Sequence, residues 1–342
     1  MRRGLVVGSV SLLAAVGIVA VPAALSSAQT AGGGTRAIPA GGTTSIRGSA
    51  QGPDGLQQPE LRPGGEEDEP GAFNRPRPGF KNGKFPKKPL DSPVVASSAV
   101  ATSNPELGLS FEGLNHRDQR LANGGNQFSL EPPDQALCVG NGYTVEATNS
   151  VLRVWSTAGA PLTGVQDLNT FFGYPAQIDR TTGVVGPFLT DPVCLFDPTT
   201  RTFFLVVLTL DVTPAGDFIG TNHLDIAVAV DPSGTWNFYQ LDVTDDGSSG
   251  TPVHPHCPCI GDYPHVGVDG NGFYITTNEY SFFGPEFNSA QIYAFSKRAL
   301  ARGDADVLVT QLDTGARREP HTDARAMSPK ARARSGVPWR FQ

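Results

Sequence analysis

The sequence has little charge and few of the residue types that mark specialised scaffolds. Charged residues make up 17% of its 342 residues, and there are only 2 methionines, 3 tryptophans and 4 cysteines. The 26 lysines and arginines are outnumbered by 33 aspartates and glutamates, which gives a net charge of -7. Phosphate contacts need a concentrated basic face, so this balance argues against a nucleic-acid binder. The low cysteine and methionine content argues against a thiol-rich or metal-rich scaffold.

Two catalytic motifs and any long helical pattern are also missing. We find no Gly-x-Ser-x-Gly elbow and no glycine-rich phosphate loop, which disfavours esterases and nucleotide binders. Apolar residues do not keep a 3.6-residue period beyond two turns, except in a short predicted helix near Ser296 to Arg302. Instead, 40 glycines and 29 prolines form about a fifth of the chain, above the roughly 12% average. This excess indicates many turns or a long linker.

The N-terminus has the layout of a secretory signal. Basic residues at Arg2 and Arg3 precede an apolar stretch from Leu5 to Val21, and small residues end the segment at Ser26-Ser27-Ala28. We expect a signal peptide over residues 1–28, cleavage after Ala28 and secretion to the extracellular space. The alternative is an uncleaved membrane anchor, because the apolar stretch approaches the ~20 residues that span a bilayer. We expect membrane contact only through such an anchor.

Export changes the interpretation of the cysteines, because an oxidising compartment favours disulfides. One residue separates Cys257 from Cys259, an awkward spacing for a bond between them, so we expect them to pair with Cys138 and Cys194. The alternative is a metal site, since His254, His256 and His265 lie in the same twelve residues. Structural zinc sites draw ligands from two separated segments, so we predict disulfides and no metal.

Composition divides the rest of the chain into three regions. Residues 29–103 are rich in Gly, Ser, Ala and Pro, which predicts a disordered linker; a cell-wall tether through its basic residues is the alternative. Residues 104–313 hold short β-branched and aromatic runs between turn residues, which predicts an all-β domain. Residues 314–342 are basic and show no periodicity, so we expect a disordered tail.

Self-comparison of the β region shows a repeated unit. Three segments begin with an aspartate near a proline and enter an apolar strand, at Asp134, Asp191 and Asp262. Each continues through a second and a third strand, and a fourth ends in Gln-Leu-Asp at Asp242 and Asp313. Four strands per unit predict a β-propeller-like fold with about three blades, with a β-sandwich as the alternative. Because propellers close with at least four blades, we expect an incomplete, truncated propeller.

The residues at the strand entrances also carry a family resemblance. The segments Leu130–Gly142 and Cys259–Gly267 resemble a group of secreted bacterial propeller proteins whose activity is mostly unassigned, with similarity from about Gly108 to Leu300. More remotely, Asp231–Trp236 is similar to the Asp-box turn of sialidase-type blades, with two residues between Asp and Gly where that turn has one. The Asp-Pro entrance also looks like that of five-bladed furanosidases.

Candidate functional residues follow from this architecture. First strands line the channel of a propeller, so Asp134, Asp191 and Asp262 would converge at one mouth, with Glu279 or Glu146 as a second-strand acid. Paired carboxylates of this kind serve glycoside hydrolysis, whereas the alternative is that each aspartate accepts backbone N–H groups in a turn. Side chains expected to bind a ligand at this mouth are Tyr263, His265 and Tyr280.

No cofactor is expected, although calcium has one candidate loop. Asp242, Asp245 and Asp246, followed by Gly247, form a short oxygen-rich segment without EF-hand spacing. We therefore expect a secreted binding or scaffold module, directed at a glycan or a cell-surface protein. A glycoside hydrolase, sialidase-like or furanosidase-like, is the alternative.

Overall fold

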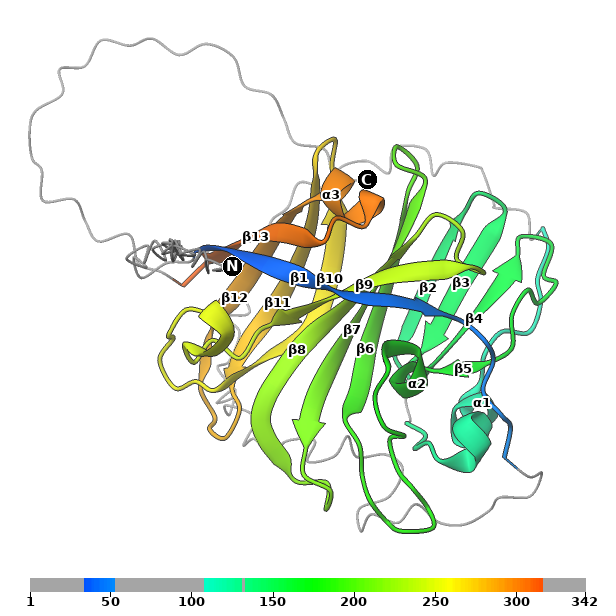
Figure 1. The fold of residues 1–342 in the computed structure, drawn as a ribbon, viewed down its shortest axis with the longest axis horizontal. Coiled ribbons are helices and arrows are strands. Elements are labelled where there is room, and N and C mark those ends of the chain that lie inside the picture. The colour runs from blue at the N-terminus through cyan, green and yellow to red at the C-terminus, as the bar shows by residue number, and fades with distance from the viewer. Residues whose placement is uncertain (1–33, 53–107, 131–132, 316–342) are drawn as a thin grey trace, which may run out of the picture.

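The computed structural model describes residues 34–52, 108–130 and 133–315, and these residues form a mostly β structure (Figure 1). The all-β prediction is confirmed. The strands form a nine-stranded antiparallel sheet, nearly closed and barrel-like, and a separate four-stranded sheet. Of the predicted linker, residues 34–52 are described and the others are not. The predicted signal peptide and nearly all of the predicted basic tail also lie outside the described residues.

Twelve of the strands form three consecutive antiparallel meanders, which match the three predicted units. The first comprises β2 (Gln135–Gly140), β3 (Tyr143–Thr148), β4 (Val151–Ser156) and β5 (Gln166–Asp167). The second comprises β6 (Phe188–Asp197), β7 (Thr202–Val212), β8 (Phe218–Ala229) and β9 (Thr235–Asp242). The third comprises β10 (Cys259–Val268), β11 (Gly272–Ser281), β12 (Phe287–Ser296) and β13 (Asp306–Asp313).

Local sequence explains how these strands turn and how the short helices begin and end. Asn141 and Gly142 both have positive φ, at 47° and 86°, as a two-residue hairpin between β2 and β3 requires. The predicted helix near Ser296 is confirmed as α3 (Lys297–Arg302): Ser296 caps its first turn and Gly303 ends it in the left-handed region. The described residues hold two other α-helices, α1 (His116–Leu121) and α2 (Leu168–Phe172), and two short 3-10 helices, η1 (Ala122–Gly125) and η2 (Ser248–Gly250).

A strand from the predicted linker connects the second and third meanders. β1 (Thr35–Ser45) pairs through its first half with β13, at Thr35 opposite Thr310, and through its second half with β9, at Ala40 opposite Tyr239. The linker prediction is therefore wrong for these residues. β1 pairs with the edge strands β9 and β13 and satisfies their backbone groups. It thereby joins the eight strands of the second and third meanders into the nine-stranded sheet. Separate propeller blades are not resolved in the described residues, so that part of the fold prediction is not met.

The middle meander lies between two apolar cores. Along β7, Phe204, Val206 and Leu208 enter a core shared with β11, β12 and β13. The alternate residues Phe203 and Leu205 enter a second core shared with the four-stranded sheet and α2. Because both faces of β7 are covered, its sequence is a continuous apolar run instead of an alternating one.

The first strands of the three meanders are neighbours in space. β6 contacts β2 on one side and β10 on the other, and a disulfide links Cys138 in β2 to Cys194 in β6. The first strand of the second unit therefore lies beside the first strands of the other two, and these are the strands in or next to which the sequence analysis placed its candidate aspartates.

Candidate functional site

The predicted aspartates lie at irregularities of the first strands. Pairing of β6 with β7 shifts between Thr190 and Val193, and pairing of β10 with β11 shifts between Asp262 and His265. Each bulge holds one non-glycine residue with φ of 51°, Asp191 in β6 and Tyr263 in β10. Asp191 is therefore equivalent to Tyr263 in strand position. Asp262, one residue before Tyr263, is instead equivalent to Thr190. Bulges and left-handed non-glycine residues are enriched beside functional sites.

These aspartates have different surroundings. Asp191 is buried, and its Oδ1 accepts a hydrogen bond from the Thr190 hydroxyl at 3.1 Å. Asp262 is half-buried and lies opposite Asn278 of β11. Asp134 is also half-buried, immediately before β2, where its carbonyl accepts from the Asn149 amide at 2.9 Å.

Of the three predicted ligand-binding residues, two lie together. Tyr263 and His265 are exposed on β10, with ring centroids 4.6 Å apart and nearly perpendicular planes. Tyr280 is on β11, where it packs against Phe287 at 5.1 Å between centroids. Tyr263 and His265 thus form an exposed aromatic pair beside the β10 bulge.

Glu279 belongs to a buried cluster that the sequence analysis did not assemble. Its Oε1 lies 2.7 Å from His254 Nδ1, and the same nitrogen lies 3.6 Å from Asp245 Oδ2. The glutamines Gln291 and Gln311 donate to Glu279 Oε2 at 3.3 Å and to Asp245 Oδ2 at 2.7 Å. The Asp245, Glu279 and His254 side chains are 0%, 1% and 8% exposed. This group is called the Asp–His–Glu cluster below.

Burial and proximity shift the acidity of the Asp–His–Glu cluster. Burial, followed by the hydrogen bond to and charge of Glu279, raises the pKa of Asp245 well above its usual range. Burial alone would lower the pKa of His254, but the hydrogen bond to Glu279 and the carboxylate charges outweigh it and raise that pKa. Two carboxyl groups and an imidazole thus share one desolvated space.

All four cysteines form disulfides, but the predicted pairing is wrong. Cys138 pairs with Cys194, with Cα atoms 5.4 Å apart, because β2 and β6 are neighbours. Cys257 and Cys259 pair with each other, with Cα atoms 4.3 Å apart, just below the usual range. The two cysteines flank Pro258, and the Cys257–Pro258 peptide bond is cis.

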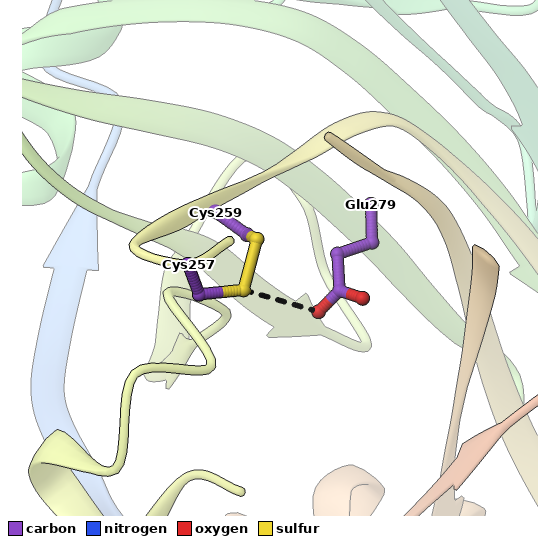
Figure 2. Close-up of side chains that lie close together, drawn as sticks. All are labelled: Cys257, Cys259 and Glu279. Carbon is purple, nitrogen blue, oxygen red and sulfur yellow. Dashed lines mark hydrogen bonds between the residues drawn. A yellow bond between two sulfur atoms is a disulfide. The ribbon is translucent and has the colours of Figure 1, made fainter. Parts of the chain in front are cut away.

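Figure 2 shows the Cys257–Cys259 disulfide beside Glu279. Cys257 Sγ lies 3.8 Å from Glu279 Oε1. A disulfide sulfur carries no proton, so this is a packing contact and the glutamate's hydrogen bonds come from His254 and Gln291. The oxidised sulfurs cover one side of the Asp–His–Glu cluster.

The loop considered for calcium uses its carboxylates in different ways. Asp242 accepts from the Thr244 amide at 2.9 Å, and Asp246 accepts from the Ser248 amide at 2.8 Å. Asp245, between them, turns inward to the Asp–His–Glu cluster. Two of the three residues therefore accept backbone N–H groups in turns, as aspartate commonly does.

A second polar cluster joins α2 to the middle meander. The Tyr174 hydroxyl lies 2.6 Å from His223 Nε2 and donates to Asp225 at 2.9 Å. Burial, followed by the charge of Asp225, strongly raises the pKa of Tyr174. The tyrosine therefore stays protonated and can keep donating to the aspartate.

The structure also contains a cavity of about 650 Å³ between β1 and α2. Its polar part is a connected network in which Ser49 donates to Asp167, Gln166 Nε2 donates to Ser49 at 3.2 Å, and Asn123 lies 3.5 Å from Asp167. Asp167 also caps α2 by accepting from the Thr170 amide at 2.8 Å. The cavity is thus lined by groups that α2 and the sheets hold in fixed positions.

Aromatic rings and an arginine complete this cavity. Phe172 and Phe238 meet at 6.2 Å between centroids, and the Phe238 ring covers Gly41 so closely that a Cβ there would lie 2.4 Å from it. Arg47 is exposed at the cavity, and its Nε donates to Ser45 at 3.4 Å. Sequence analysis missed this site because its β1 part looked like linker.

Comparisons with known proteins add little to this picture. No family model and no curated protein matches the chain. Among solved structures, the GH43 BlXynB protein from Bacillus licheniformis matches with a TM-score of 0.21 and 13% identity over 48% of this chain. The match spans 39% of that protein, and a likeness of this size carries no functional argument. None of the described helices has the length and apolar character needed to cross a membrane.

Proposed function

We propose that the chain is a secreted binding module that takes a sugar-containing ligand in the cavity between β1 and α2. The cavity carries this proposal: its volume of about 650 Å³ is that of a small-molecule site, and it combines aromatic rings with fixed polar groups. Sugars offer hydroxyl groups together with apolar C–H faces, so they suit such a lining. The two disulfides support the proposed oxidising compartment.

Arg47 is the group on which the test depends. It is exposed at the cavity, so its loss leaves the hydrogen-bonded network of Ser49 and Asp167 in place. Bound sugar hydroxyls or a sugar carboxylate would accept from the guanidinium, and such charge-assisted bonds contribute about 1.5–3 kcal/mol. We expect Arg47→Ala to weaken binding roughly tenfold to a hundredfold.

A glycan array followed by titration calorimetry tests the proposal. The parent chain is compared with Arg47→Ala and with Arg298→Ala, a matched control because Arg298 is an exposed arginine of α3 outside the cavity. Binding retained in Arg298→Ala and reduced in Arg47→Ala supports the proposal. Absence of any glycan ligand, or equal affinities in all three proteins, refutes it.

Glycoside hydrolysis is the second candidate, and the matching bulges of β6 and β10 favour it. They put Asp191 and Asp262 in irregular segments of first strands, beside the exposed Tyr263–His265 pair. A chromogenic glycoside screen with Asp191→Asn and Asp262→Asn tests it. Turnover that both variants abolish while thermal unfolding is unchanged supports catalysis, whereas a lower melting temperature without any turnover in the parent supports a structural role.

A further inference from the structure

We propose that Asp245, His254 and Glu279 form a binding site for one divalent transition-metal ion of the zinc type. Asp245 and His254 lie nine residues apart in the connection between β9 and β10, and Glu279 lies in β11. One ligand atom from each lies within 4.8 Å of the others. This juxtaposition is independent of the sugar cavity.

The donor distances suit a small ion. His254 Nδ1 is 2.7 Å from Glu279 Oε1 and 3.6 Å from Asp245 Oδ2. Nitrogen and oxygen ligands at their usual zinc distances stand roughly 3.4 Å apart around a tetrahedral ion. The observed separations lie on either side of that value, so side-chain shifts below about 1 Å would complete the geometry.

Two buried atoms of the cluster lack the partners that a closed hydrogen-bond network would supply. Within residues 34–52, 108–130 and 133–315, neither Asp245 Oδ1 nor His254 Nε2 has a hydrogen-bond partner. Buried polar atoms are almost always satisfied, and an orphan of this kind indicates an absent water or ion. An ion bound by the Asp245 carboxylate through both oxygens would satisfy Oδ1.

A second layer of residues fixes the carboxylates in place. Gln311 Nε2 bonds both Asp245 Oδ2 at 2.7 Å and Gln291 Oε1 at 3.1 Å, and Gln291 in turn bonds Glu279. Such outer-shell amides orient metal-ligating carboxylates and maintain the site. Gln291 and Gln311 are both 0% exposed, so this orientation is shielded from water.

Donor type and charge select the ion. Metal binding displaces protons from its ligands, so in the bound state two ionised carboxylates and a neutral imidazole would balance a 2+ charge in a space from which water is excluded. An imidazole ligand favours zinc, nickel or copper over calcium and magnesium, which prefer oxygen ligands. The disulfide between Cys257 and Cys259 removes thiolates from the donor set.

The test uses the tag-free, disulfide-bonded chain, treated with chelator and dialysed. Zn²⁺ is titrated by calorimetry, with Mg²⁺ and Ca²⁺ in parallel, and thermal unfolding is recorded with and without Zn²⁺. The variants are His254→Gln and Glu279→Gln. His256→Asn is the matched control, because His256 is an exposed histidine of the same loop and its positive φ of 63° suits asparagine.

We expect the parent and His256→Asn to bind one Zn²⁺ per chain and to melt at a higher temperature with Zn²⁺. His254→Gln should bind at least roughly tenfold more weakly. Glu279→Gln removes a different ligand, and its melting temperature should no longer rise when Zn²⁺ is added. The proposal is overturned if the folded parent binds no Zn²⁺, if both variants bind like the parent, or if His256→Asn loses binding.

Discussion

Replacing Lys297 with methionine should reveal how strongly a buried ion pair holds α3 to the middle meander. Lys297 Nζ lies 3.1 Å from Asp197 Oδ2, and the two side chains are 1% and 3% exposed. The ammonium also donates to the Thr199 hydroxyl at 2.8 Å. Methionine keeps the apolar stem, so Lys297→Met removes the charge and leaves Asp197 buried without its cation.

The expected loss follows from what remains around Asp197. Breaking a buried pair by removing one partner costs about 3–5 kcal/mol. Thr199 and Thr200 still donate to this carboxylate, with their hydroxyls at 2.8 and 2.6 Å. We therefore expect the lower end, about 3 kcal/mol, which corresponds to a melting temperature roughly 6–12 °C lower in a domain of this size.

Thermal and urea unfolding measure this loss, with Arg302→Met as the control. Arg302 lies on the same helix and pairs with Asp304, but the two side chains are 63% and 35% exposed. Solvent screens this pair, so Arg302→Met should change the free energy of unfolding little. Equal effects of the two substitutions would refute the reasoning.

The pH dependence of the Lys297→Met effect provides a further check. Burial opposes ionisation of Asp197, but hydrogen bonds from Thr200, Thr199 and Lys297 outweigh it and hold its pKa below the usual range. A depressed folded-state pKa gives stability that is present above the unfolded pKa and lost as pH falls through the folded one. The difference between parent and Lys297→Met should therefore narrow below about pH 4.

Two further predictions concern the disulfides and His223. Cys138→Ser with Cys194→Ser opens a bridge between residues 56 positions apart, which should lower the free energy of unfolding by about 4 kcal/mol. Opening the Cys257–Cys259 bridge, with a sequence separation of 2, should lower it by only about 1.5 kcal/mol, so equal losses in urea unfolding would contradict the prediction. Burial alone would lower the pKa of His223, but its hydrogen bond to Asp225 and the carboxylate charge raise it. Stability from His223 is therefore full below about pH 6.5 and is lost as pH rises through the folded pKa, so His223→Gln should flatten the stability profile above about pH 6.5. Parallel profiles for parent and variant would show that His223 is not the titrating group.

The strands of the meanders could be predicted because their signals are local. β-branched and aromatic runs are bounded by turn residues, as β4 (Val151–Ser156) is by Asn149, which has a positive φ of 42°. β1 could not be predicted in this way, since Pro39, Gly41 and Gly42 have the composition of a linker. Its strand conformation depends on two edges supplied by residues far along the chain.

The candidate site was predictable only in its parts. Asp245, His254 and Glu279 were each noted, in a calcium loop, a histidine–cysteine segment and a second strand, but no sequence spacing joins them. The bulges caused a similar difficulty, because Asp191 and Asp262 look equivalent until strand pairing shows them one position apart. Non-local pairing determines both arrangements, and one chain's sequence does not display it.

The position of β1 also constrains the order in which the protein can assemble. Thr35 and Thr310 face each other across a sequence separation of 275 residues, so the first half of β1 is synthesised long before its partner β13. A chain that emerges N-terminus first must keep this half of β1 unpaired until β13 has appeared. Long-range closure of this kind slows folding, so the final insertion of β1 is a natural point for a chaperone to act.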